Sequence, residues 1–323
     1  MKRNHGRWLS LVLTLLLLVL QACSPSGGSM PPAGAESPAA EASDTADMAD
    51  AEGEKEQTMT EGSGQEMSLL AFNVGKADSL LLRSGSTTYL IDTGRGKNWE
   101  TIEEGLKALG VERLDGVIIT HMDSDHVGGL KKLLKSDLQV GCVYAPAFYL
   151  PEEKEDKENP AVKAVAKQNV ELVFLQGGDA LPLDGGSLRI LGPLRAATDK
   201  EDNNSLVMLA EAAGSRILLA GDMEFPEEQS LLEAGVIPRA EVLKVGNHGD
   251  GDATSDALLQ AIQPKIAVIS TSTEEKSDTP ANRVMRALKA WDTEVYQTQE
   301  AKWGILVTIR DGVISAARLD RLK

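Results

Sequence analysis

A six-residue segment of the chain contains two histidines and two aspartates, His121-Met-Asp123-Ser-Asp125-His126. Imidazole and carboxylate groups are ligands for borderline and hard divalent cations. Alternate positions of an extended segment point the same way, so His121, Asp123 and Asp125 can converge, with His126 on the adjacent side. Because so many ligands lie so close together, the segment favours two metals over one. Two neighbouring metals can lower the pKa of a water held between them and stabilise both the attacking and the leaving oxygen.

Two further candidate ligands lie later in the chain. Asp222 and His248 each come shortly after an apolar segment. Side chains at strand ends project into the loops where sites are built, and Asp222 is placed where a carboxylate could bridge two metals. The alternative is a surface loop in which Asp123 or Ser124 simply caps the next helix. The full set of ligands, each part after an apolar strand, favours the metal site.

The hydrophobic pattern predicts the elements that must position these side chains. Strands alternate with helices, and hairpins interrupt them, which predicts a mixed sheet or a pair of sheets covered by helices. The predicted helices are 98–109, 127–138, 226–234, 255–262 and 280–290. The predicted strands are 68–74, 79–83, 88–92, 115–120, 140–144, 170–175, 188–191, 205–210, 216–220, 241–245, 266–270, 293–296 and 304–309.

The N-terminus has the pattern of an export signal. Basic residues precede an apolar run over 8–20, which is short for a membrane-spanning helix. Leu-Gln-Ala-Cys23 closes the run and resembles a bacterial lipobox, so we expect residues 1–23 to be a lipoprotein signal and Cys23 to be acylated. The alternative is an ordinary cleaved signal with a chance cysteine. Only one other cysteine exists, Cys142, which we expect to be a buried core thiol.

Residues 24–66 are rich in small, polar and acidic residues and contain no Leu, Ile, Val or aromatic residue. Such a segment cannot bury enough apolar surface to offset its chain entropy, so we predict a disordered acidic linker before a folded domain at 67–323. The whole chain has a formal net charge of −16. This charge argues against a broad basic surface for nucleic acid, although bound metals could supply local positive charge.

A set of motifs, in order, resembles the metallo-β-lactamase-fold domain of the ComEC/Rec2 competence family and covers roughly residues 67–310. The resemblance implies an α/β fold, a four-layer αββα sandwich with two mixed β-sheets covered by helices. The matching segments are Asn73-Val-Gly-Lys-Ala-Asp78, Leu90-Ile-Asp-Thr-Gly94, His121-Met-Asp-Ser-Asp-His-Val-Gly-Gly129, Asn203-Asn-Ser-Leu-Val207, Leu218-Leu-Ala-Gly-Asp222 and Leu243-Lys-Val-Gly-Asn-His-Gly249.

The same resemblance implies roles for individual residues around two divalent metal ions, Zn²⁺ or Mn²⁺. One metal would be held by His121 and Asp123, the other by Asp125, His126 and His248, with Asp222 between them. Asp125 and Asp222 would be the ligands most directly involved in catalysis. The residues that would support the ligands or line the site are Asp78, Asp92, Asn204 and Ser205, with Asp92 orienting a ligand imidazole through its free ring N–H.

The chain also departs from the pattern of the family and of the wider superfamily. Asp123 stands where the superfamily usually has a histidine, and a further ligand histidine is absent where Asn203, Asn204 and Ser205 lie. Asn247 replaces the first of two paired histidines at the last motif. Fewer imidazoles make the site harder, which favours Mn²⁺ or a mixed site over Zn²⁺ alone. The departures also leave one metal short of ligands.

These features favour an extracytoplasmic, lipid-anchored, metal-dependent hydrolase that attacks phosphodiesters through a hydroxide between its metals. The expected partners are the membrane, through the lipid anchor, and a nucleic acid or other phosphodiester as substrate. A second possible function on the same fold is an amide or ester hydrolase of the β-lactamase type, which breaks a different bond. A non-catalytic metal-binding or ligand-binding lipoprotein is the alternative from a different class.

Overall fold

The computed structural model describes residues 65–151 and 158–322. The predicted signal segment, the lipidation site at Cys23 and the predicted linker up to residue 64 lie outside the described residues. The first strand begins at Glu66, one residue before the predicted start of the domain. Among the described residues, no helix is both long and apolar enough to span a bilayer.

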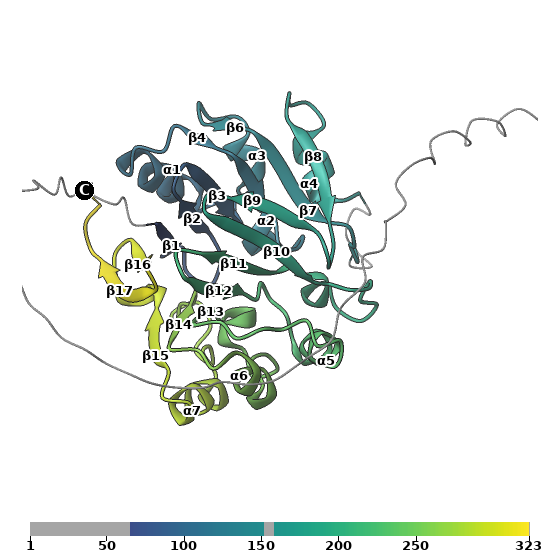
Figure 1. The fold of residues 1–323 in the computed structure, drawn as a ribbon. Helices are drawn as coiled ribbons and strands as arrows, with labels where there is room; N and C mark the ends of the chain where they lie inside the picture. Colours follow the sequence, from purple (N-terminus) through teal and green to yellow (C-terminus); the bar gives the residue numbers. More distant parts are fainter. Residues whose placement is uncertain (1–64, 152–157, 323) are drawn as a thin grey trace, which may run out of the picture. The chain divides into compact units, whose positions relative to one another are not determined.

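Two large mixed sheets form the centre of the folded domain (Figure 1). Over the described residues, the first sheet has the strand order β17 (Val313–Leu319), β16 (Gly304–Arg310), β1 (Glu66–Phe72), β2 (Leu80–Ser84), β3 (Thr87–Ile91), β5 (Gly116–Ile118), β7 (Cys142–Pro146) and β8 (Glu171–Leu175). The second has the order β15 (Glu294–Gln297), β14 (Ile266–Ile269), β13 (Val242–Lys244), β12 (Ser215–Leu219), β11 (Val207–Ala212), β10 (Gly186–Gly192) and β9 (Ala180–Leu183). A small ladder joins β4 (Arg113–Leu114) to β6 (Gln139–Val140).

Helices cover the outer face of each sheet. The first sheet carries α1 (Trp99–Ala108), α2 (Ser124–Val127), α3 (Leu130–Leu133) and α4 (Pro160–Val165). The second carries α5 (Phe225–Glu233), α6 (Asp256–Ile262) and α7 (Asn282–Ala290), as Figure 1 shows below the strands. Three 3₁₀ turns complete the described elements: η1 (Glu201–Asn204), η2 (Gly246–Gly249) and η3 (Thr298–Glu300).

Three hydrophobic cores separate these layers, one between the sheets and one under each set of helices. The alternation of side chains along a strand explains how one strand serves two cores. In β1, Leu69 and Ala71 pack between the sheets, whereas Leu70 and Phe72 pack under the helices. This arrangement confirms the predicted αββα sandwich with two mixed sheets.

The structure differs from the predicted elements in several places. The predicted helix 127–138 is wrong, because this segment contains only the end of α2 and the short α3. A Cβ at Gly129 would lie 2.3 Å from the carbonyl oxygen of Thr93, so the chain turns there in close contact with a neighbouring loop. The prediction missed β9, β17 and α4, and Cys142 is half-buried rather than part of the core.

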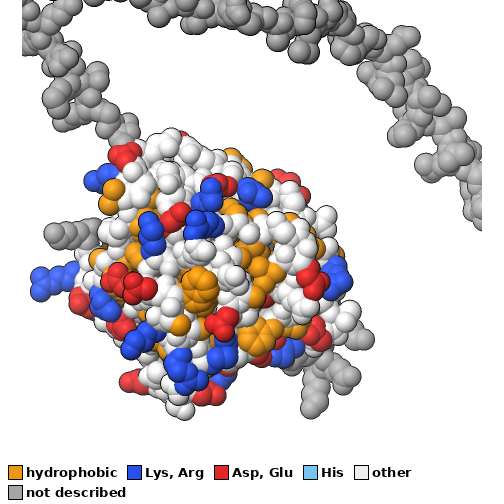
Figure 2. All heavy atoms as spheres, turned by 60° about the horizontal axis from the view of Figure 1, so that its bottom comes forward, with side chains coloured by type: hydrophobic (Ala, Val, Ile, Leu, Met, Phe, Trp, Pro, Cys, Tyr) orange, Lys and Arg blue, Asp and Glu red, His pale blue; other side chains and the backbone are white. Residues whose placement is uncertain are grey.

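The surface carries charges of both signs. Figure 2 shows one face of the domain, where basic and acidic side chains are interspersed and apolar side chains lie between them. Over the described residues visible in this view, the basic side chains form no continuous surface.

Candidate metal centre

The candidate ligands, and the residues that orient them, follow the ends of four strands, two from each sheet, and lie close together. Asp92 follows β3 and His121 follows β5 after two further residues, and these strands run parallel in the first sheet. Asp222 and His248 follow β12 and β13, which run parallel in the second sheet. Because parallel strands end at the same edge of a sheet, the loops after them meet.

Asp92 fixes the orientation of His126. Its Oδ2 lies 2.8 Å from Nδ1 of His126, and its two oxygens accept hydrogen bonds from the backbone N–H and the hydroxyl of Thr120 at 2.8 and 2.7 Å. Asp92 has a φ of 60°, which only a few residue types adopt without strain, so it is both a turn residue and a support for the imidazole. With Nδ1 bound to this carboxylate, Nε2 of His126 faces Asp222.

His248 is oriented in the same manner by the backbone. Its Nδ1–H donates to the carbonyl oxygen of Ser270 at 2.8 Å, which leaves the lone pair of Nε2 free. Nε2 lies 3.2 Å from Oδ2 of Asp222 and 3.9 Å from Oδ2 of Asp125. Asn247 and His248 both have positive φ, at 41° and 53°, so local strain accompanies the placement of this ring.

Asp222 lies between the imidazoles of His126 and His248, with Oδ2 at 3.3 and 3.2 Å from their Nε2 atoms. Its backbone N–H donates to the hydroxyl of Ser205 at 3.1 Å, so Ser205 supports the turn that carries this carboxylate. Although burial favours the neutral acid, His248 and His126 hold the pKa of Asp222 well below its usual value. We call Asp125, His126 and His248 the imidazole-rich half of the centre.

His121 faces a different set of neighbours. Its Nε2 lies 3.8 Å from Oδ2 of Asp123 and 4.0 Å from Oδ1 of Asp202. Burial and the neighbouring His126 hold the pKa of His121 well below its usual value, which favours the neutral, ligating form of the ring. We call His121, Asp123 and Asp202 the oxygen-rich half of the centre.

The position of Asp123 bears on the capping alternative. Asp123 occupies the N-cap position of α2, but its side chain makes no capping hydrogen bond. Its carboxylate points instead toward His121. Burial, with the neighbouring carboxylates of Asp125 and Asp222 opposed by His126, raises the pKa of Asp123 to about 6.

Asp125 is held from outside the centre by Arg95. Nη2 of Arg95 lies 3.0 Å from Oδ2 of Asp125, while Nη1 contacts the carbonyl oxygen of Lys76 and lies 3.2 Å from Glu275. The guanidinium is thus fixed at three points beside a candidate ligand. Arg95 was not among the predicted site residues, because a basic residue after Ile-Asp-Thr-Gly gives no signal of its own.

Asp78, predicted to line the site, lies behind the imidazole-rich half. Its Oδ2 lies 2.7 Å from Nζ of Lys244, and both side chains are about 1% exposed. Its Oδ1 lies 3.9 Å from Nδ1 of His248. Although burial raises it, Lys244 and His248 leave the pKa of Asp78 below its usual value. The charge pair is therefore buried against the centre.

Asn204, predicted to support or line the site, is hydrogen-bonded within its own loop. Its side-chain amide donates to Glu201 at 3.0 Å, and its side-chain oxygen accepts from the backbone N–H of Ala197. These hydrogen bonds stabilise the turn η1, whose Glu201 in turn accepts a hydrogen bond from the backbone N–H of Met122. The residue of this turn that reaches the centre is Asp202, which was not among the predicted site residues because a single aspartate in a polar loop has no signal of its own. Burial and the nearby carboxylates of Asp222 and Asp123 raise the pKa of Asp202 to about 6.

Several buried side-chain atoms of the centre lack a hydrogen-bond partner among the described residues. A buried polar atom without a partner costs roughly 1–3 kcal/mol, so such atoms are rare unless a ligand meets them. Groups of three of the candidate side chains bring their ligand atoms within 4.8 Å of one another. The donor set therefore fits divalent cations. The unpartnered atoms are Nε2 of His121, of His126 and of His248, and Oδ1 of Asp222.

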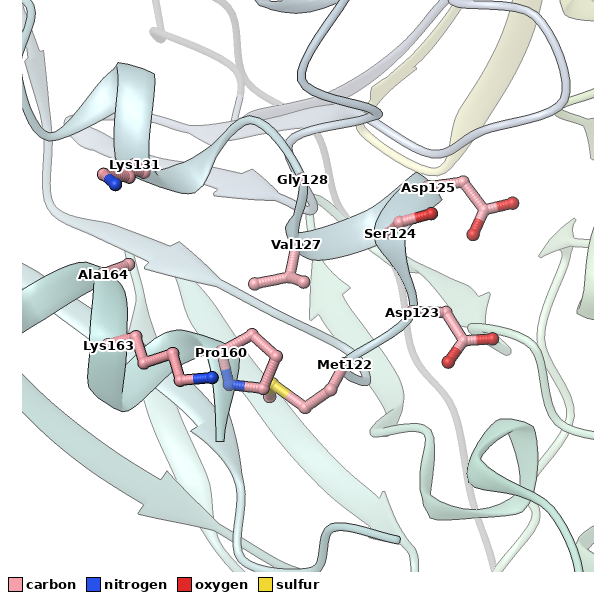
Figure 3. A pocket seen from close by; sticks show the side chains of 10 residues that line it. All are labelled: Met122, Asp123, Ser124, Asp125, Val127, Gly128, Lys131, Pro160, Lys163 and Ala164. Atoms are coloured by element: carbon pink, nitrogen blue, oxygen red, sulfur yellow. The ribbon is translucent and has the colours of Figure 1, made fainter. Parts of the chain in front are cut away.

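A pocket of about 490 Å³ lies beside the loop that carries the histidine motif (Figure 3). Figure 3 shows Met122 and Val127 directed toward Pro160, whereas the carboxylates of Asp123 and Asp125 extend away from that side of α2. Asp123 and Asp125 are among the residues that line this pocket, so it borders the loop that carries the candidate ligands. The side chain of Asp123 is 49% exposed, so the oxygen-rich half is open to solvent at this carboxylate.

The sandwich of two mixed sheets and the imidazoles and carboxylates gathered at its strand ends define a class of α/β protein built to hold metal ions. The family model of the metallo-beta-lactamase superfamily matches residues 73–273. The chain belongs to the metallo-β-lactamase superfamily, whose members are generally hydrolases and bind divalent metals such as zinc.

Relatives among characterised proteins support the resemblance to the competence family. ComE operon protein 3 of Bacillus subtilis is 31% identical over 195 residues, which are 60% of this chain and 25% of the relative. Recombination protein 2 of Haemophilus influenzae is 28% identical over 231 residues, 70% of this chain and 27% of the relative. The chain therefore spans about a quarter of the length of these relatives, and the resemblance to the ComEC/Rec2 family is confirmed.

A solved structure supports the fold alone. The metallo-beta-lactamase fold protein YhfI of Bacillus subtilis matches 76% of this chain and 99% of its own, with a TM-score of 0.51 and 12% identity. At this identity the comparison carries no information about the substrate.

Proposed function

We propose that the protein is an exported, lipid-anchored enzyme that hydrolyses phosphodiesters with two divalent metal ions at this centre. The observation that carries the proposal is the group of buried, unpartnered imidazole nitrogens that face a common carboxylate, Asp222. The competence-type motifs and the relatives favour a nucleic acid as the substrate over an amide or a lactam.

In this proposal Asp125, His126 and His248 hold one metal, His121 and Asp123 hold the other, and Asp222 serves both. When bound, such metals activate water and stabilise the negative charge that develops on the phosphate oxygens.

The protein supplies a fixed frame for these ligands. Asp92 and the carbonyl of Ser270 hold two imidazoles with Nε2 directed inward. Arg95 lies at the rim beside Asp125, with its side chain 30% exposed, and offers a cation to an anionic substrate. Such fixed charges act on a phosphodiester without reorganising during the reaction.

The test uses the full-length protein in detergent, depleted of metal and then supplied with Mn²⁺ or Zn²⁺. Single-stranded DNA and bis(p-nitrophenyl) phosphate are the phosphodiester substrates, and nitrocefin tests for lactam hydrolysis. We expect phosphodiester cleavage that Asp125→Ala abolishes and that the exposed control variant Asp199→Asn retains. Metal binding without any turnover would support a binding protein instead, and rapid nitrocefin hydrolysis would move the assignment to the β-lactamase type.

The lipid anchor is tested separately. Labelling of cells with a clickable fatty acid is expected to mark the wild-type protein and leave Cys23→Ala unmarked. Protease added to spheroplasts is expected to degrade the anchored protein, because the proposal places the domain on the extracytoplasmic side. Equal labelling of both proteins would contradict the anchor while leaving the enzymatic proposal intact.

A further inference from the structure

The oxygen-rich half contains one imidazole, and a carboxylate from the turn η1 lies close to it. Oδ1 of Asp202 is 4.0 Å from Nε2 of His121, and Oδ2 of Asp123 is 3.8 Å from the same nitrogen. The side chain of His121 is fully buried, and its Nε2 has no hydrogen-bond partner among the described residues. Two carboxylates thus converge on one unpartnered imidazole nitrogen, and a cation among them would partner all three.

The turn that carries Asp202 is tied to the loop that carries His121. The carboxylate of Glu201 accepts hydrogen bonds from the backbone N–H of Met122 at 3.2 Å and of Leu150 at 2.7 Å. The backbone N–H of Leu206 donates to the carbonyl of Thr120 at 2.9 Å. Residues on both sides of Asp202 are therefore hydrogen-bonded to residues on both sides of His121. These bonds hold the carboxylate of Asp202 close to the imidazole of His121.

The same turn is also tied to the loop after Asp222. The side-chain oxygen of Asn203 accepts a hydrogen bond from the backbone N–H of Glu224 at 3.3 Å. The side chain of Asp202 caps no helix, and among residues 65–151 and 158–322 its ion-pair contact is the one with His121. The side chain of Asp202 is 22% exposed, and its carboxylate lies in a group with His121 and Asp123 whose ligand atoms are within 4.8 Å of one another, so one cation could contact all three.

We propose that Asp202 is a metal ligand and takes the place of the missing imidazole in the oxygen-rich half. The inference rests on the proposed function, because it assumes that this centre binds metal. With His121 as its one imidazole and carboxylates from Asp123, Asp202 and Asp222, this position is harder than the imidazole-rich half. Its preference for Zn²⁺ over Mn²⁺ is therefore weaker than that of the imidazole-rich half, so Mn²⁺ competes best at this position.

The test measures metal binding rather than turnover. The full-length protein in detergent is depleted of metal and titrated with Mn²⁺, and free Mn²⁺ is followed by its electron paramagnetic resonance signal. We expect two Mn²⁺ per chain for the wild type and for the control Asp199→Asn, an exposed residue in the same loop. For Asp202→Asn we expect one site to keep its affinity and the other to weaken by roughly 10-fold or more.

A second variant tests the identity of the ligand. Asp202→His restores an imidazole, so it is expected to keep two sites and to shift the weaker site from Mn²⁺ toward Zn²⁺ in a competition titration. Thermal unfolding without metal checks that both variants fold. Two sites of unchanged affinity in Asp202→Asn, or an unchanged metal preference in Asp202→His, would overturn the inference and leave the proposed function standing. A wild type that binds no metal would overturn the proposed function itself.

Discussion

The two halves of the candidate centre differ in how firmly the protein holds them. In the imidazole-rich half, His126 and His248 are fully buried, and each has its second ring nitrogen fixed, by Asp92 or by the carbonyl of Ser270. In the oxygen-rich half, the side chains of Asp123 and Asp202 are 49% and 22% exposed. The two imidazoles of the first half are fixed before any ligand arrives, whereas the carboxylates of Asp123 and Asp202 in the second half are open to solvent.

This difference predicts that the two halves have different roles in metal binding and substrate entry. A preorganised set of imidazoles loses little freedom when a metal binds, so the imidazole-rich half should hold its metal more tightly. The open half has the exposed ligands, so substrate and exchangeable metal should enter there. Asp222 couples the two halves. Its carboxylate lies within 4.8 Å of a ligand atom of His121, from the one half, and of ligand atoms of His126 and His248, from the other.

The largest effect is expected behind the imidazole-rich half, at Lys244. Lys244→Met leaves the carboxylate of Asp78 buried without its cation, so the free energy of unfolding should fall by roughly 3–5 kcal/mol. Urea denaturation measures this loss. Replacing both partners, with Lys244→Met and Asp78→Leu together, should recover most of it.

The control is the exposed Lys289→Met, for which we expect a change within about 0.5 kcal/mol. A Lys244→Met variant as stable as this control would mean that the ion pair does not support the fixed half.

The next largest effect is expected at the shared carboxylate. Asp222→Asn removes the negative charge between His126 and His248 and should weaken metal binding in both halves. Loss of a residue that only supports a metal ligand lowers metal affinity or activity by at most roughly 100-fold. The carboxylate of Asp222 contacts the ligands directly, so its loss should lower the rate of hydrolysis by more than this. Elemental analysis and initial rates measure the two losses. If this variant retained both metals, Asp222 would not couple the two halves.

Removal of a supporting residue should affect one half alone. Asp92→Asn changes the hydrogen bond to His126 and should reduce metal affinity in the imidazole-rich half by roughly 10- to 100-fold. The oxygen-rich half, whose ligands do not contact Asp92, should keep its affinity. A competition titration with a metal chelator resolves the two sites, and equal weakening of both would show that the halves are not independent.

The smallest effect is expected from pH and concerns the oxygen-rich half. Burial raises the pKa of Asp123 and of Asp202 to about 6 from an ordinary value of 3.8. Between these values the folded protein binds more protons than the unfolded chain. The stability of the metal-depleted protein should therefore fall as the pH rises through this window.

Thermal unfolding at several pH values measures this contribution. It is the difference in the slope of stability against pH between the wild type and the double variant Asp123→Asn/Asp202→Asn. The effect is small because water screens the half-exposed Asp123. Saturating Mn²⁺ should reverse the sign of the slope, since metal binding to these carboxylates releases their protons. Identical slopes for the two proteins would contradict the raised pKa values.

The imidazole-rich half could be predicted from the sequence because its ligands follow apolar strands with a recognisable spacing. Asp202 could not be predicted, since a single aspartate in a polar loop has no periodic signal, and it is the hydrogen bonds of Glu201 and Leu206 that bring its turn to the loop of His121. The burial of Lys244 could not be predicted from the sequence either, because its partner Asp78 lies in a distant part of the chain.

The pattern of apolar residues predicted a mixed sheet or a pair of sheets covered by helices, and the four-layer sandwich followed from the family resemblance, but the edge strands β9 and β17 were missed. The edge strand β17 has a largely exposed pattern, so it lacks the apolar signal of the central strands. The predicted helix 127–138 failed because the close contact of Gly129 with Thr93 is a property of the packed chain.

A crystal structure of the protein soaked in Mn²⁺, with anomalous scattering recorded at the manganese edge, tests the central claim most directly. We predict two anomalous peaks, one among Asp125, His126 and His248 and the other between His121 and Asp202, with Asp222 adjacent to both. The absence of any peak at these side chains, or peaks only at other places on the surface, would contradict the account.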